Sequence, residues 1–158
     1  MENGSVILDT FTIERTYPER AAQVFAAFAS LEAKSIWGDT GGFESVAGEA
    51  EEFDFRPGGH ERFVIRVGDT DYRYDAQYYD IVPDARIVYA YEMYANGRRI
   101  SVSLATIEFL ETHGTTILRL HEQGAYLDGI DGAEAPSLRR EGTAEMLDGL
   151  ATYLATSE

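Results

Sequence analysis

The stretch Glu51–Phe63, EEFDFRPGGHERF, decides the fold, because it holds two alternating strand halves joined by a tight turn. Phe53 and Phe55 alternate with charged residues, which is the period of two expected of a strand with one face in a core. Pro-Gly-Gly at 57–59 interrupts the pattern, since proline donates no ladder hydrogen bond and glycine tolerates a positive φ. The alternation resumes at Phe63, so the stretch predicts a β-hairpin.

Length and composition indicate a single domain over residues 1–158 that needs no disulfide to hold its core. Cysteine is absent, which excludes a thiol nucleophile and a thiolate metal site. The first residues contain only the short apolar run 6–8 and no basic start, so we expect neither a signal peptide nor a membrane span there. These features favour a cytoplasmic protein.

The charge is strongly acidic, with 13 lysines and arginines against 28 aspartates and glutamates, which gives a net charge of −15. Such a surface repels polyphosphate, and no stripe of basic residues reverses it locally. We therefore expect neither nucleic acid nor an anionic membrane as a partner. Solubility explains the acidity, and attraction to a basic partner is the alternative.

The chain before the hairpin predicts one strand and two short helices. Val6–Tyr17 alternates as a strand, and Pro18 ends it at a position that suits the first turn of a helix. Apolar residues at helical spacing then occupy 21–28, and Ser30 can cap a second helix over Leu31–Trp37.

The chain after the hairpin predicts a meander of strands followed by one long helix. Asn96-Gly97 is the strongest turn signal, because a type I′ turn requires positive φ at both residues. The long helix covers Leu138–Leu154 and carries leucines along one side. The expected strands lie at about residues 61–67, 72–81, 86–95, 98–110 and 115–123.

The predicted fold class is therefore α+β: a curved antiparallel sheet of about seven strands, with two short helices after the first strand. The long C-terminal helix packs across this sheet. Because the apolar face of the sheet is longer than one helix is wide, we expect a cavity between them.

Several residue groups recur in this order in one known superfamily. They are Val24-Phe25, Trp37-Gly38, FDFRPGG at 53–59, Tyr78 with Ile81 and Pro83, RIVY at 86–89, and GTT at 114–116 with Leu118 and Leu120. On these residues the chain resembles the START-like or SRPBCC superfamily of helix-grip domains, over positions 11–154. Within it, the chain looks like the branch named after activators of the heat-shock protein 90 (Hsp 90) ATPase. One departure is Thr143 after Gly142, where that branch usually carries Gly-Trp.

The resemblance implies a helix-grip domain and leaves three hypotheses for function, since the superfamily includes lipid carriers, polyketide cyclases and chaperone regulators. The favoured hypothesis is a small-molecule binding protein with a hydrophobic, tyrosine-rich cavity for a lipid-like or aromatic ligand. The alternatives are a polyketide cyclase or aromatase-like enzyme and a protein-binding regulator such as an Hsp 90 ATPase activator homologue. Binding is favoured over catalysis, and a homodimer stays open.

Candidate ligand-binding residues follow from turning the apolar side of each strand toward the long helix. Val102 and Met93 point inward in the same assignment. Ten tyrosines are present, and a buried phenol needs a hydrogen-bond partner, so inward hydroxyls suit a cavity that holds water or a polar-decorated ligand. The alternative is that they reach solvent at the rim. The candidates are Phe28, Trp37, Phe55, Phe63, Tyr74, Tyr78, Tyr89, Tyr91, Leu104, Leu120, Glu122 and Leu147.

Glu122 is the one acidic residue among these candidates. It shares the inward parity of Leu118 and Leu120, so its carboxylate could move protons or anchor a ligand. The alternative places it past the end of the strand, in solvent. His121 has the opposite parity, so we expect it to be exposed.

Charged residues of the hairpin alternate against its phenylalanines. Asp54, Arg56, Arg62 and Arg66 share this parity, and cross-strand ion pairs on the outer face of the sheet explain all four. If the parity is inverted, Asp54 and Arg56 become buried and are the best catalytic candidates.

Motifs for metals, nucleotides and common hydrolases are absent. The three histidines, His60, His113 and His121, lack metal-ligand spacing, and the glycine pairs lack the spacing of phosphate-binding loops. No GxSxG elbow is present. We therefore expect no metal and no cofactor, and we assign no catalytic residue.

Overall fold

A computed structural model describes residues 4–38, 44–45 and 52–156. The composition of Gly38-Asp39-Thr40-Gly41-Gly42 predicts a loop, and this segment lies mostly outside the described residues. Apart from one additional short strand, the helices and strands follow one another in the expected order. The helices are α1 (Ala21–Ala29), α2 (Leu31–Trp37) and α3 (Ala135–Thr156). The strands are β1 (Val6–Tyr17), β2 (Glu44–Ser45), β3 (Glu52–Phe53), β4 (His60–Val67), β5 (Thr70–Val82), β6 (Arg86–Ala95), β7 (Arg98–Thr112) and β8 (Thr115–Leu127).

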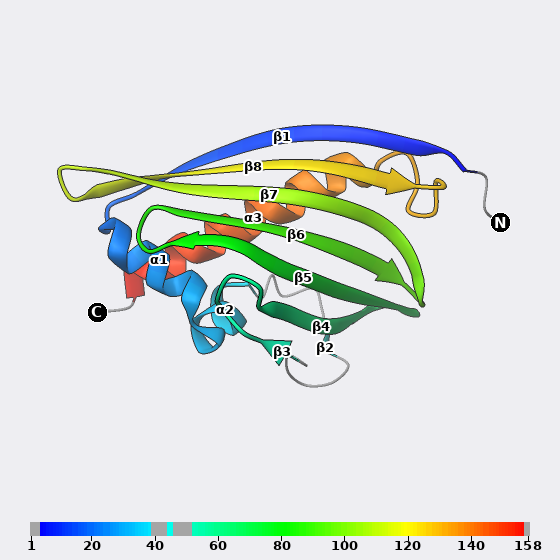
Figure 1. Ribbon diagram of the computed structural model, residues 1–158, viewed down its shortest axis with the longest axis horizontal. Helices are drawn as coiled ribbons and strands as arrows, with labels where there is room; N and C mark the ends of the chain where they lie inside the picture. The colour runs from blue at the N-terminus through cyan, green and yellow to red at the C-terminus, as the bar shows by residue number, and fades with distance from the viewer. Residues whose placement is uncertain (1–3, 39–43, 46–51, 157–158) are drawn as a thin grey trace.

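The strands form one antiparallel sheet in the order β1-β8-β7-β6-β5-β4-β2, and β3 pairs with β4 (Figure 1). The prediction of an α+β fold with a curved antiparallel sheet is confirmed. The meander from β4 to β8 uses the expected turns, where Asp84, Asn96 and His113 adopt positive φ of 64°, 48° and 55°. Local turn chemistry therefore sets the order of the central strands.

Helix α2 has the expected boundaries, whereas α1 begins at Ala21 with Arg20 as its N-cap, so Pro18 lies before the helix and not in its first turn. Ser30 caps α2 by accepting a hydrogen bond from the backbone N–H of Ala33 at 3.1 Å. Glu111, at the end of β7, accepts the backbone N–H of Ala21 at 2.8 Å, which satisfies a free donor at the start of α1. The sequence pattern alone does not reveal this long-range cap.

The hairpin of residues 52–60 is confirmed, although its first strand ends at Phe53 instead of continuing through Arg56. The turn is held against β5, because the N–H of Gly58 donates to the carbonyl of Tyr78 at 2.7 Å and the N–H of Tyr78 donates to Gly59 at 2.9 Å. A Cβ at Gly59 would lie 2.0 Å from the carbonyl oxygen of Asp54, so only glycine fits.

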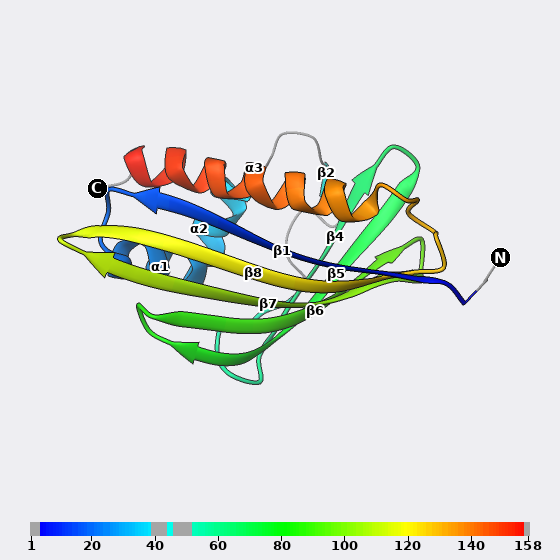
Figure 2. The same ribbon diagram turned by 90° about the horizontal axis from the view of Figure 1, so that it is seen from above.

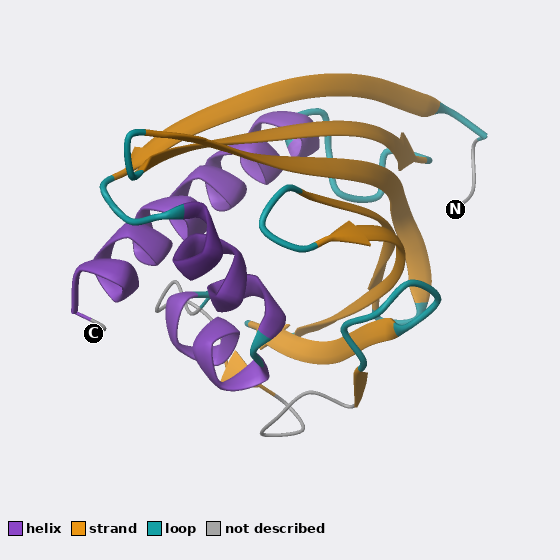
Figure 3. Cartoon of the chain, turned by 60° about the vertical axis from the view of Figure 1, so that its left-hand side comes forward, coloured by secondary structure: helices purple, strands orange, loops and turns teal. Residues whose placement is uncertain are grey.

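All three helices lie on the concave side of the sheet (Figures 2 and 3). The C-terminal half of α3 forms the closed core, where Leu147, Leu150 and Leu154 are buried with the apolar residues of α1 and α2. Gly149 lets α3 approach α2 closely, since a Cβ there would lie 2.7 Å from the carbonyl oxygen of Trp37.

The strand β7 corrects one sequence-based assignment. Val102 and Leu104, expected to face α3, are 41% and 42% exposed on the outer face. The inner positions of the same segment are instead Ser101, Ser103 and Ala105, all buried. The prediction was wrong because it took apolar residues as the mark of the inner side, and here small polar residues face an interior that contains charged groups.

Candidate functional site

A continuous series of rings covers the inner face of strands β4, β5 and β6. Neighbouring rings lie 4.8–6.1 Å apart between centroids, in stacked, tilted and edge-to-face arrangements. Such offset contacts are the favourable geometries for aromatic pairs. We call this series the aromatic ladder. Its members are Phe63, Tyr74, Tyr91, Tyr89, Tyr78 and Phe55.

Small residues of β7 lie beside the aromatic ladder. Ser103 is the sheet partner of Tyr91, and Ala105 is the partner of Tyr89. Gly124 of β8 follows in the same row as Ser103. Because these side chains are short, Arg139 of α3 can reach the sheet there, with its Nη1 3.4 Å from the Ser103 hydroxyl. The ladder rings of Phe63, Tyr74 and Tyr89 stay partly exposed, and we call the space that they border on the inner side the recess.

A first polar group, the Glu122 cluster, closes one side of the ladder. The Tyr91 hydroxyl donates to Glu122 Oε2 at 2.6 Å, and Arg139 Nη1 lies 3.7 Å from the same oxygen. Arg139 comes from α3 and also donates to Ser101 at 2.9 Å and to the Tyr91 hydroxyl at 3.0 Å. The Glu122 cluster consists of Glu122, Tyr91, Arg139, Ser101 and Ser103.

The pKa of Glu122 is raised, and burial is the largest cause. The hydrogen bond from Tyr91, the charge of Arg139 and contact with Ser103 act in the opposite direction. Glu122 is only 3% exposed, so the inward parity is confirmed and the solvent alternative is wrong. A buried carboxylate with a cation, a phenol and a hydroxyl around it can hold or transfer a proton.

A second polar group, the Glu61 cluster, lies at the other side of the ladder. Glu61 is 5% exposed, and its Oε1 accepts both the Tyr78 hydroxyl and the ammonium of Lys34, each at 2.7 Å. Lys34 belongs to α2 and also lies 5.7 Å from the centroid of the Phe53 ring. The Glu61 cluster consists of Glu61, Tyr78 and Lys34.

Two ladder hydroxyls lie between these clusters without a partner. Burial raises the pKa of Tyr74 and of Tyr89, yet both side chains keep part of their surface exposed. In the described part of the chain no hydrogen bond reaches either hydroxyl, whereas Glu19 Oε1 is the one buried unpaired side-chain atom that is sealed from solvent. The hydroxyls of Tyr74 and Tyr89 therefore face space that water can enter.

The predicted site residues fall into three groups. The ladder residues and Glu122 come together on the inner face, as described above. Phe28, Trp37, Leu120 and Leu147 lie instead in the closed core around α1 and α2, where the Trp37 indole N–H donates to the Ala27 carbonyl at 2.9 Å. Leu104 lies on the opposite face of the sheet, in an open hollow of about 550 Å³.

Three charged residues of the site were missed by the sequence analysis, although a signal for two of them exists. Glu61 shares the parity of Phe63 on β4, so it could have been placed inward. Arg139 lies two helical steps of four residues before Leu147, which puts it on the inner side of α3. Lys34 has no comparable signal, because its long stem reaches Glu61 from the neighbouring helix α2.

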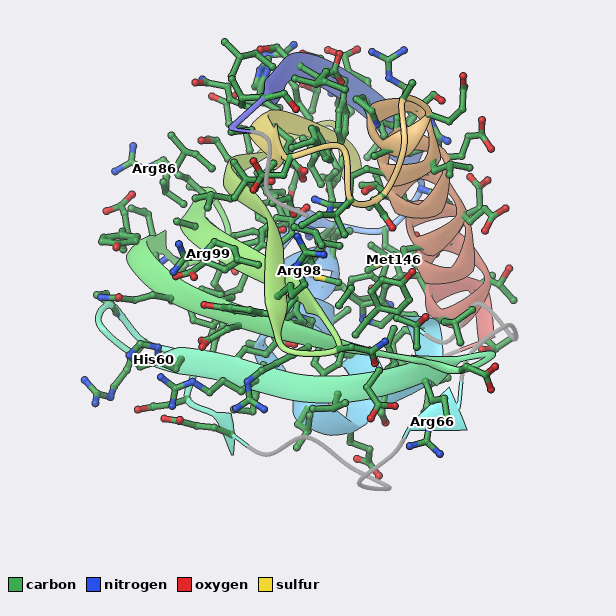
Figure 4. The ribbon with its side chains drawn as sticks, turned by 90° about the vertical axis from the view of Figure 1, so that its right-hand side faces the viewer. His60, Arg66, Arg86, Arg98, Arg99 and Met146 are labelled. Atoms are coloured by element: carbon green, nitrogen blue, oxygen red, sulfur yellow. The ribbon has the colours of Figure 1, made fainter. Side chains whose placement is uncertain are left out.

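The charged residues of the hairpin lie outside the candidate site. Asp54 and Arg56 pair with each other at 2.8 Å near the surface, not across strands as expected. Arg62 and Arg66 do pair across strands on the outer face, with Asp75 and Asp71. Their outward orientation is as predicted, and in Figure 4 Arg66 and Arg86 point away from the space beside α3, whereas Met146 points into it.

His121 is also on the outer face, with its ring 2.8 Å from the Thr12 hydroxyl. In the part of the chain that the structure describes, no three histidine, aspartate or glutamate side chains are grouped so that they could hold a metal ion. Of the described helices, none combines the length and the apolar character that crossing a membrane requires.

Comparisons with known proteins agree with this architecture. The family model described as "Activator of Hsp90 ATPase homolog 1-like protein" matches residues 19–155. A solved structure of an uncharacterised protein from Rhizobium leguminosarum is 39% identical, with a TM-score of 0.87 over 97% of this chain and 98% of that one. The Mll3558 protein from Rhizobium loti is 42% identical, with a TM-score of 0.79 over 94% and 99% of the two chains.

A more distant structure shares the fold alone. Protein CV1439 from Chromobacterium violaceum is 20% identical and gives a TM-score of 0.76 over 94% of this chain and 98% of that one. No curated protein matches the chain. The family model covers most of the sequence, and the chain therefore belongs to the family of activator of Hsp90 ATPase homolog 1-like proteins, within the START-like (SRPBCC) superfamily.

Proposed function

We propose that this protein binds a small aromatic molecule between the aromatic ladder and α3. The observation that supports this proposal is the partial exposure of Tyr74 and Tyr89, whose hydroxyls have no partner among the described residues although both side chains point toward the interior. A protein core normally pairs every buried phenol, because an unmade hydrogen bond costs about 1–3 kcal/mol. A ligand or water can form the hydrogen bonds that these two hydroxyls lack.

The shape of the recess supports an aromatic ligand. Ladder rings on β4, β5 and β6 offer flat faces, and those of Phe63, Tyr74 and Tyr89 stay partly exposed on the inner side. A planar molecule can stack on such rings at little conformational cost, since both partners are rigid.

Native mass spectrometry and thermal-shift measurements with a library of aromatic and lipid compounds test this proposal. A ligand present at 100 times its Kd stabilises the folded state by about 2.7 kcal/mol, which raises the unfolding temperature measurably. Aromatic compounds should give such shifts. An experimental structure with a fully packed interior, or a library without any shift, would contradict the proposal.

A matched pair of variants in α3 locates the site. Ala144 packs against the inner side and Ala151 is exposed on the same helix. Ala144→Trp should fill the recess and abolish the ligand-induced shift, whereas Ala151→Trp should keep it. Circular dichroism on both variants checks that the added ring has not unfolded the protein.

A second candidate function is acid–base catalysis on the bound molecule. Glu122 has a raised pKa and accepts the Tyr91 hydroxyl at 2.6 Å, which is an arrangement able to move a proton. Turnover of an aromatic polyketide substrate that is lost in Glu122→Gln, with binding retained, would support catalysis. Binding without turnover in both forms would leave ligand binding as the function.

Regulation of a chaperone is supported by the family name and by no contact described above. Pull-down with heat-shock protein 90 and an assay of its ATPase rate separate this function from the other two. An unchanged ATPase rate would count against it.

A further inference from the structure

We propose that the bound molecule is uncharged and carries a hydroxyl that donates a hydrogen bond to Glu61, so that the site selects hydroxylated aromatic compounds over carboxylates. This inference rests on the proposed function, and it narrows the ligand from aromatic molecules in general to uncharged ones that carry a hydroxyl.

The two carboxylate oxygens of Glu61 differ in their contacts. Both donors in the Glu61 cluster, Tyr78 and Lys34, bind Oε1. No described residue donates to Oε2, although the side chain is only 6% exposed. A carboxylate normally accepts bonds at both oxygens, so Oε2 is an unused acceptor on a residue that lies opposite Ala76, between Tyr74 and Tyr78 of β5.

Water can reach Oε2 of Glu61. Glu19 Oε1 is the buried side-chain atom without a partner in the described chain, and Oε2 of Glu61 does not share its sealed state. Oε2 must therefore remain in contact with space large enough for water. A ligand hydroxyl can reach it while the rings of Tyr78 and Tyr74 lie alongside.

The charges on the inner side disfavour an anionic ligand. Two described cations lie beside the ladder, Lys34 and Arg139, and each already has a carboxylate partner, Glu61 and Glu122. Arg140, the next residue of α3, is exposed and packs over the Phe11 ring instead. An anionic ligand would bring a third negative charge into a recess with no spare cation, at a high cost of desolvation. The overall net charge of −15 acts in the same direction at longer range.

The free groups of the recess together define the ligand. Glu61 Oε2 accepts a hydrogen bond, and the hydroxyls of Tyr74 and Tyr89 can donate or accept one. A ring system with a hydroxyl at its edge meets these groups while it stacks on the ladder. A fatty acid that is ionised at neutral pH has no hydroxyl to donate to Glu61 Oε2, and its carboxylate adds an unpaired negative charge.

Four related probes test the inference by calorimetry at neutral pH: naphthol, naphthalene, the methyl ether of naphthol, and naphthoate. Naphthalene is smaller than naphthol and the ether is larger, so weaker binding of both reports the lost hydroxyl donor and not size. A hydrogen bond to a charged acceptor contributes about 1.5–3 kcal/mol, which is roughly 10-fold to 100-fold in Kd. Naphthol should bind more tightly than the other three by about this factor.

The substitution Glu61→Gln replaces a free hydrogen-bond acceptor with donors. The amide oxygen accepts from Tyr78 and Lys34, so the amide N–H₂ takes the place of Oε2. The preference for naphthol over its methyl ether should then fall below about threefold, because the amide can donate to the oxygen of either compound. Glu52→Gln makes the same chemical change on the outer face, where Glu52 pairs with Arg62, and should keep the wild-type preference.

The outcomes separate this inference from the proposed function. If naphthalene or the ether binds wild type as tightly as naphthol, or if naphthoate binds best, the role of Glu61 is wrong and the aromatic site remains. An unaltered preference in Glu61→Gln has the same meaning. If none of the four probes binds and the wider library gives no thermal shift, both proposals fall together.

Discussion

Glu122 and Arg139 carry opposite charges into the interior and hold each other there. Glu122 is 3% exposed and the Arg139 side chain 17% exposed, and the two groups share Tyr91 as a hydrogen-bond partner. Taking both groups out of water is costly, and their mutual attraction offsets that cost only while both are present. The pair therefore connects the N-terminal half of α3 to β8.

Removal of the cation should reveal this dependence. Arg139→Met leaves a buried carboxylate without its partner, so we expect the free energy of unfolding at neutral pH to fall by about 3–5 kcal/mol. Urea unfolding followed by circular dichroism measures the loss. The double variant with Glu122→Gln should recover much of it, and a loss below about 1 kcal/mol in the single variant would show that the pair is not coupled.

The raised pKa of Glu122 has a defined effect on stability. A group that binds its proton more tightly when folded stabilises the fold more as the pH falls from the raised pKa toward the ordinary value of 4.5. Stability from this group is therefore lost as the pH rises through that window. The difference in unfolding free energy, Glu122→Gln minus wild type, should increase from pH about 4.5 to pH 7.

Glu111 provides a control of opposite sign. The backbone N–H of Ala21 is the main cause that lowers the pKa of Glu111, and Arg20 adds to it. Its stabilising effect is present above the ordinary pKa of 4.5 and is lost as the pH falls through the lowered value. For Glu111→Gln the same difference should decrease with rising pH below 4.5, and equal slopes for the two variants would contradict both assignments.

Two leucines that look alike in the sequence should respond differently to truncation. Leu120 is 4% exposed in the core, and Leu104 is 42% exposed on the outer face. Leu120→Ala should cost about 2–5 kcal/mol, and Leu104→Ala below about 1 kcal/mol. Chemical denaturation compares the two variants, and equal losses would mean that β7 has the orientation first expected from its apolar residues.

Side-chain orientation was predictable where the interior is apolar and not where it is polar. Phe63, Tyr74 and Tyr89 were placed inward correctly, since apolar alternation marks a buried face. On β7 the inner positions hold Ser101 and Ser103, whose hydroxyls accept hydrogen bonds from Arg139, a residue of another element. Alternation within one strand cannot report a partner that arrives from α3.

At the scale of elements, α3 has two halves that are held in different ways. The C-terminal half packs Leu147, Leu150 and Leu154 into the core, whereas the exposed Leu138 leaves the N-terminal half anchored through Arg139. The existence of this helix was predictable from its periodicity, and so were the turns and the cap of α2, which depend on local chemistry. The anchoring of its first half was not, because it depends on the curl of the sheet.

The two glycines inside α3 should respond in opposite ways to alanine. A Cβ at Gly142 meets no atom within 4 Å, so Gly142→Ala should stabilise the protein by about 0.5–1 kcal/mol through helix propensity. A Cβ at Gly149 would lie 2.7 Å from the Trp37 carbonyl oxygen, so Gly149→Ala must push α3 away from α2 and should destabilise it. Thermal unfolding of both variants checks the prediction, and a gain in both would show that the helices do not touch at Gly149.

At the scale of the whole molecule, repulsion dominates the surface charges. A net charge of −15 opposes compaction, although arginine pairs such as Arg119 with Glu14 are spread over the outer face. Exposed pairs contribute little to stability, so screening them loses less than screening the net repulsion gains. The acidic composition does not describe the interior, where Glu61 and Glu122 each lie beside a cation, Lys34 and Arg139.

Salt should therefore stabilise the protein. Raising sodium chloride from low to physiological ionic strength at neutral pH is expected to raise the unfolding temperature, because the Debye length shortens to about 8 Å. A neutral osmolyte at equal osmolarity controls for exclusion effects. A fall in the unfolding temperature with salt would show that the surface pairs outweigh the repulsion.

The pairing of β1 has a consequence for how the chain becomes folded. Val6 lies opposite Leu127 and Tyr17 opposite Thr116, and among the described strands β8 is the sole neighbour of β1. Because β1 leaves the ribosome long before β8, it must wait for β8 before it gains a ladder partner among the described strands. Closing such a long loop is slow, and an unpaired strand invites association with other chains. We expect docking of β1 onto β8 to be the event that completes the domain after synthesis.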